Sequence, residues 1–134
     1  MPDFNKKATT SILIIDDSKP SRAILQKTLD RIMPGSNYIQ SASLKDAFDH
    51  IENNNIILIF IDRYLSAENN MEFIKKLKQN DDPTPIIICS SELSEVDIIN
   101  FQSAGADSFL TKPFLPENVK KSVNRFIKLQ PALG

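Results

Sequence analysis

Polar side chains that could bind a metal ion or a phosphate follow four apolar segments of this chain. The longest segment, residues 55–62 (NIILIFID), runs through six consecutive apolar residues and stops on Asp62. Carboxylates are the usual ligands of hard cations, and an aspartate can also act as a nucleophile toward a phosphoryl group. The other three segments end on Asp16 with Asp17, on Ser90 and on Lys112.

The apolar segments themselves predict buried β-strands. Six apolar residues are too few to span a membrane, and they lack the alternation of a half-exposed strand, so residues 55–62 are expected to be buried on both faces. Four shorter segments are interpreted in the same way. The five strands are expected at residues 11–15, 37–42, 55–62, 85–90 and 107–111.

Between and after the strands, apolar residues recur at helical spacing and predict five helices. Ser18 and Ser43 are expected to cap the first two helices, with Pro20 in the first turn, and Gly105 is expected to end the fourth. The apolar positions are Ile24, Leu25, Leu29 and Ile32; Leu44, Ala47, Phe48 and Ile51; Phe73, Ile74 and Leu77; Val96 and Ile99, with Phe101 and Ala104 as further candidates; and Val119, Val123, Phe126 and Ile127.

Strands that alternate with helices predict an α/β three-layer fold with a doubly wound, five-stranded parallel sheet. The three most apolar strands should be central, which favours the strand order 2-1-3-4-5. Parallel strands place all their carboxyl ends at one edge of the sheet. The polar residues that end four of them should therefore meet in one crevice.

Three carboxylates in one crevice repel each other unless positive charge lies among them. Lys112 is one source of that charge, and a divalent cation is the other. A hard cation that keeps several waters and leaves room for a phosphate is typical of Mg²⁺, with Mn²⁺ as a substitute. With Asp62 as the nucleophile, Lys112 and the Ser90 hydroxyl would each hold a phosphoryl oxygen.

Composition sets the outer bounds. The chain has 134 residues, 41% hydrophobic and 25% charged, which is ordinary for one soluble domain. A net charge of −1 gives no field that would attract nucleic acid or a membrane surface. Its one cysteine, Cys89, lies in an apolar run and fits a buried thiol in a reducing compartment. We expect a cytoplasmic protein with a flexible N-terminus (1–10), one domain (11–130) and a tail (131–134).

The chain resembles the receiver domain of two-component response regulators over about residues 11–129, with a flavodoxin-like fold. The resemblance rests on Asp16-Asp17 after the first strand, Asp62 after the third, Ser90 after the fourth and Lys112-Pro113-Phe114 after the fifth. It implies that Asp62 receives a phosphoryl group from a histidine kinase or a histidine phosphotransfer protein. It also implies a Mg²⁺ held by Asp62, Asp17, Asp16 through water, and the backbone carbonyl of Tyr64.

The same resemblance implies how the signal leaves the domain. Ser90 would swing toward the phosphoryl oxygen, and Phe109 stands where the family has a switch aromatic. The surface of the fourth helix, fifth strand and fifth helix would contact a downstream partner or output domain, or pair two copies of the chain. Tyr64 and Glu92 are expected to shape access of the water that removes the phosphoryl group.

The loop after Asp62 departs from the family pattern. Where the family usually has Met-Pro and then a Gly, this chain has Leu65-Ser66 and Asn70. Asn tolerates a positive φ angle better than other non-glycine residues, so Asn70 or Asn69 is expected to keep the turn.

Other functions fit the sequence less well. A receiver-like interaction module that works without phosphorylation draws support from Ser66 and Asn70 alone. A phosphohydrolase would need a second acid where Tyr64 stands, and a flavodoxin would need a hydroxyl- and glycine-rich phosphate loop where Asp16-Asp17 stands. We therefore do not expect an enzyme. Ser90 could instead cap the helix that follows it.

Overall fold

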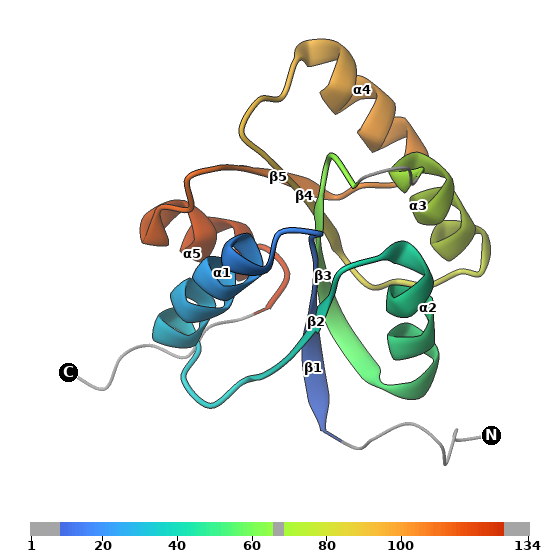
Figure 1. The fold of residues 1–134 in the computed structure, drawn as a ribbon. Coiled ribbons are helices and arrows are strands. Elements are labelled where there is room, and N and C mark those ends of the chain that lie inside the picture. Colours follow the sequence, from blue (N-terminus) through green and yellow to red (C-terminus); the bar gives the residue numbers. More distant parts are fainter. Residues whose placement is uncertain (1–8, 66–68, 128–134) are drawn as a thin grey trace.

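Five parallel strands form one sheet in the order β2-β1-β3-β4-β5 in the computed structural model (Figure 1). The structure describes residues 9–65 and 69–127. The strands are β1 (Thr10–Ile15), β2 (Asn37–Ser41), β3 (Asn55–Asp62), β4 (Ile86–Ser90) and β5 (Ser108–Thr111). The helices are α1 (Lys19–Ile32), α2 (Leu44–Asn53), α3 (Asn70–Gln79), α4 (Glu95–Ala104) and α5 (Pro116–Asn124). This confirms the predicted fold class and strand order.

Helices cover both faces of the sheet, α1 and α5 on one face and α2, α3 and α4 on the other (Figure 1). Side chains of β1 alternate between the two cores: Leu13 and Ile15 pack toward α2 and α3, and Ile12 and Ile14 pack toward α1 and α5. Burial on both faces explains why the strand segments are continuously apolar rather than alternating. Packing on both faces holds the strands in place, and it therefore also holds the edge of the sheet at which the strands end.

Ser18 and Ser43 begin α1 and α2, and Gly105 ends α4, as predicted. The Ser18 and Ser43 hydroxyls accept hydrogen bonds from backbone N–H groups in the first turns of α1 and α2. Ser94 and Asp97 form a reciprocal capping box at the start of α4. Gly105 ends α4 with a φ of +121°, a conformation that favours glycine.

The predicted inward face of α4 was wrong in part. Val96 and Ile99 are 64% and 61% exposed, whereas Phe101 and Ala104 are the buried residues of this helix. Apolar residues lie on several sides of α4 instead of one stripe, so the spacing alone could not identify the core face. Ile24 of α1 is likewise exposed.

The last helix is shorter than the sequence suggested. Val119 and Val123 of α5 are fully buried, and Phe126 and Ile127 pack against the same core beyond the end of the helix. The predicted N-terminal and C-terminal segments fall largely outside the described residues. Within residues 9–65 and 69–127, no helix is long and apolar enough to cross a membrane.

Candidate functional site

Three carboxylates meet at the carboxyl-terminal edge of the sheet. Asp16 and Asp17 directly follow β1, and Asp62 is the last residue of the neighbouring strand β3. One oxygen from each of the three side chains lies within 4.8 Å of the others. Because β1 and β3 are adjacent and parallel, their ends bring these residues together although they lie far apart in the sequence.

Lys112 lies between two of the three carboxylates. Its Nζ atom is 2.9 Å from Asp16 Oδ2 and 2.9 Å from Asp62 Oδ1. The lysine follows β5, and its backbone N–H donates to the Ser90 carbonyl at 2.8 Å, which holds the end of β5 against the end of β4. The ammonium is thus part of the carboxylate cluster.

The charges of the crevice shift the protonation equilibria of its members. Burial raises the pKa of Asp62, and the Asp16 carboxylate acts in the same direction, while Lys112 opposes both effects. Burial by itself would lower the pKa of Lys112, but its hydrogen bonds with Asp62 and Asp16 outweigh that effect and raise it. The carboxylate cluster therefore contains a charged lysine at neutral pH.

The donor set fits a hard divalent cation. Three carboxylates supply the oxygen ligands that Mg²⁺ prefers, and a divalent cation would add positive charge beside that of Lys112. Two carboxylate oxygens are already oriented: Asp16 Oδ1 accepts from the Ser18 N–H at 2.9 Å, and Asp62 Oδ2 accepts from the Tyr64 N–H at 3.3 Å.

Binding of Mg²⁺ should raise the stability of the protein, and Asp17→Asn should remove most of that gain. A metal at ten times its Kd stabilises a folded protein by about 1.4 kcal/mol. The measurement is thermal unfolding with EDTA and then with MgCl₂, beside Asp49→Asn as a control, since Asp49 is an exposed carboxylate of α2. Equal stabilisation of Asp17→Asn and the wild type would place the metal elsewhere.

The Ser90 backbone carbonyl accepts a hydrogen bond from the Lys112 N–H, but the Ser90 hydroxyl bonds to the following loop. The Oγ atom donates to the Glu92 carbonyl at 2.7 Å and accepts from the Glu92 N–H at 3.2 Å, and the residue is buried. Sequence reasoning left open whether Ser90 caps the next helix. That cap is Ser94, and Ser90 instead forms a turn with Glu92.

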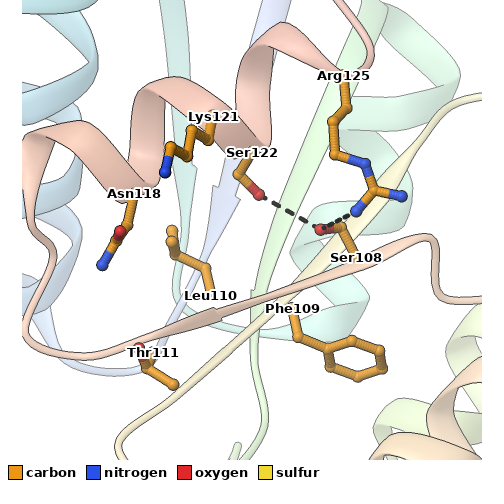
Figure 2. Close-up of a pocket in the computed structure, with 8 residues that line it drawn as sticks. All are labelled: Ser108, Phe109, Leu110, Thr111, Asn118, Lys121, Ser122 and Arg125. Atoms are coloured by element: carbon orange, nitrogen blue, oxygen red, sulfur yellow. Dashed lines mark hydrogen bonds between the residues drawn. The ribbon is translucent and has the colours of Figure 1, made fainter.

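Tyr64 and Phe109 differ in their exposure to solvent. Tyr64 is 63% exposed, and the guanidinium carbon of Arg63 lies 3.9 Å from its ring centroid. Phe109 of β5 is half-buried and packs against the core beneath α2, α3 and α4. Figure 2 shows its ring pointing away from α5.

The predicted role of Asn70 or Asn69 in a left-handed turn was wrong. Asn69 has a φ of −105° and caps α3, and Asn70 is the first residue of that helix. Asn70 is buried, and its side-chain amide donates to the carbonyls of both Asp62 and Arg63. The residue acts as a donor that holds the backbone after β3. Ser66, the other departure, lies outside the described residues.

Replacing Asn70 by Ala should lower the free energy of unfolding by about 1–3 kcal/mol, because the Asp62 and Arg63 carbonyls would lose their donor in a buried place. Urea unfolding measures this loss. Asn69→Ala is the comparison, since it removes only the cap of α3 and should cost about 1 kcal/mol. An Asn70→Ala variant as stable as the wild type would show that water replaces the amide without cost.

One ion pair of the site region was not predicted. The Arg63 guanidinium bonds to the Asp97 carboxylate of α4, and the two side chains are each 17% exposed. Arg63 lies in the loop after β3 and Asp97 lies in α4, so no spacing in the sequence could indicate that they meet.

Comparison with known proteins agrees with this geometry. The family model of the response regulator receiver domain matches residues 12–124. A chemotaxis protein CheY homologue of Campylobacter jejuni is 27% identical over 126 residues, which cover 92% of each chain. The alkaline phosphatase synthesis transcriptional regulatory protein PhoP of Bacillus subtilis is 30% identical over 125 residues, which cover 93% of this chain and 50% of that protein.

Solved structures show the same likeness. The chemotaxis protein CheY4 of Vibrio cholerae superposes with a TM-score of 0.80 at 25% identity, covering 90% of this chain and all of that one. A two-component response regulator of Clostridium difficile gives a TM-score of 0.78 at 27% identity, covering 88% of this chain and 95% of that one. The chain belongs to the response regulator receiver domain family.

Proposed function

We propose that this domain is a phosphorylation switch whose acceptor is Asp62. The donor is a phosphohistidine of a sensor kinase or a histidine phosphotransfer protein. An Asp62 oxygen forms the new bond to phosphorus, the phosphorus–nitrogen bond breaks, and the released imidazole takes up a proton. The observation that carries this proposal is the position of Asp62, which is ion-paired with Lys112 inside a cluster of carboxylates.

The surrounding groups divide the remaining tasks. Asp16, Asp17, Asp62 and the Tyr64 carbonyl would hold Mg²⁺, which supplies positive charge beside the phosphoryl oxygens when it is bound. Lys112 would exchange its bond with Asp62 for a bond with a phosphoryl oxygen and neutralise the charge of that oxygen. Ser90 must release Glu92 before its hydroxyl can donate to the phosphoryl group. That exchange of partners would move the loop between β4 and α4, whose backbone the Ser90 hydroxyl now holds.

The surface that would report this change is formed by α4, β5 and α5. It includes a groove of about 290 Å³ between β5 and α5, lined by Ser108, Phe109, Leu110, Thr111, Asn118, Lys121, Ser122 and Arg125 (Figure 2). The Arg125 guanidinium and the Ser122 hydroxyl both contact the Ser108 hydroxyl there. We propose that a downstream protein partner or an output domain binds this face, which could also pair two copies of the chain.

The direct test is the intact mass of the protein after incubation with acetyl phosphate, with Mg²⁺ and then with EDTA. We expect the protein to gain one phosphoryl group only in the sample that contains Mg²⁺. Failure to gain mass, together with failure to bind beryllofluoride as a phosphoryl analogue, would overturn the proposal in favour of a module that works without phosphorylation.

A further inference from the structure

The Arg63–Asp97 ion pair joins the residue after Asp62 to the first turn of α4. The pair connects residues 34 positions apart, and both side chains are largely shielded from solvent. Its hydrogen bond holds the pKa of Asp97 below the usual range, so the carboxylate is charged at neutral pH. A shielded, geometrically fixed pair constrains two elements more strongly than an exposed pair does.

At one end, the pair is anchored to the backbone that carries Asp62. The Arg63 N–H donates to the Cys89 carbonyl at 2.8 Å, and the Arg63 carbonyl accepts from the Asn70 amide at 2.8 Å. The guanidinium also stacks on the ring of Tyr64. A displacement of the Arg63 backbone therefore carries the guanidinium with it.

At the other end, the pair holds a helix that has few other attachments. Asp97 belongs to the capping box with Ser94, so its carboxylate is tied to the start of α4. Of the residues of α4, only Phe101 and Ala104, in its second half, are buried. Val96 and Ile99, which flank Asp97 along the helix, are exposed. The position of Asp97 thus sets where these two apolar side chains lie.

We propose that the Arg63–Asp97 pair is a link through which the state of Asp62 reaches the exposed apolar side of α4. This inference rests on the proposed function, because it assumes a phosphoryl group at Asp62. Arg63 is a positioning residue: its guanidinium bonds to Asp97, away from the carboxylate cluster. When the Arg63 backbone moves in response to the modified Asp62, the pair moves the first turn of α4 and changes how Val96 and Ile99 are exposed.

The test is methyl NMR of Val96 and Ile99 in the full chain, before and after addition of beryllofluoride with Mg²⁺. Arg63→Met and Asp97→Asn each remove the ion pair; methionine still reaches the Tyr64 ring, and asparagine keeps an oxygen for the Ser94 N–H. Asp97→Glu is the conservative variant that keeps both the charge and the cap. Ser94→Ala is the matched control, because it weakens the start of α4 and leaves the pair intact.

We expect beryllofluoride to shift the Val96 and Ile99 signals in the wild type, in Asp97→Glu and in Ser94→Ala. The shift should be clearly smaller in Arg63→Met and in Asp97→Asn, and the double variant should show no further decrease, while Asp62 still binds beryllofluoride. Full shifts in Arg63→Met and Asp97→Asn would overturn the link. A wild type that binds no beryllofluoride would instead overturn the proposed function, so the two failures can be told apart.

Discussion

Asp62→Asn should take up no phosphoryl group from acetyl phosphate and should unfold at a higher temperature than the wild type in EDTA. Uptake is lost because the amide offers no nucleophilic oxygen in place of the carboxylate. Stability rises because the substitution removes a partly buried carboxylate charge that lies beside Asp16 and shares the Lys112 ammonium with it. A gain of about 1 kcal/mol would raise the Tm by roughly 3–5 °C in a domain of this size.

The gain in stability should depend on pH. The pKa of Asp62 is raised in the folded state, so the folded protein binds this proton more tightly than the unfolded chain does. Its contribution to stability therefore falls as pH rises through the folded-state pKa. Thermal unfolding should show a higher Tm for Asp62→Asn than for the wild type at neutral pH. The difference should vanish below about pH 3, where aspartate is protonated in both states.

Two results would contradict this prediction. Phosphoryl uptake by Asp62→Asn at the wild-type rate would assign the acceptor to Asp16 or Asp17. A Tm below that of the wild type at neutral pH would show that the bond between Asp62 and Lys112 stabilises the fold by more than the crowding of carboxylates costs.

Lys112→Met should slow phosphoryl uptake by at least about 10-fold, since one preorganised cationic donor next to the reacting oxygens is lost. The variant should also be less stable by about 1–3 kcal/mol in EDTA, because Asp16 and Asp62 lose the ammonium that bonds to both. Mg²⁺ should stabilise it more than it stabilises the wild type, because the ion then provides the missing positive charge.

Rates of mass gain and urea unfolding, each with and without Mg²⁺, measure these effects. Lys120→Met is the matched control, since Lys120 is an exposed lysine of α5. If Lys112→Met took up the phosphoryl group as fast as Lys120→Met, the ammonium would serve only to hold the crevice together, and its role in the reaction would be refuted.

The fold could be predicted from the sequence because its signals are local. Continuous apolar runs indicate buried parallel strands, and Ser18, Ser43 and Gly105 mark helix ends by their own chemistry. The core face of α4 could not be identified in this way, because Val96 and Ile99 are as apolar as the residues that are buried. Which side of that helix faces the sheet depends on packing, and on the inward position of Asp97.

The sequence by itself determined that Asp16, Asp17, Asp62, Ser90 and Lys112 belong to one place, because parallel strands must end at the same edge of the sheet. Only the tertiary structure decided which side chains bond there. Lys112 bridges Asp16 and Asp62, the Ser90 hydroxyl turns to Glu92, and Asn70 holds two carbonyls. The Arg63–Asp97 ion pair, too, could be seen only in the tertiary structure. Such bonds depend on how separate elements pack, and the spacing of residues along the chain does not show which side chains will meet.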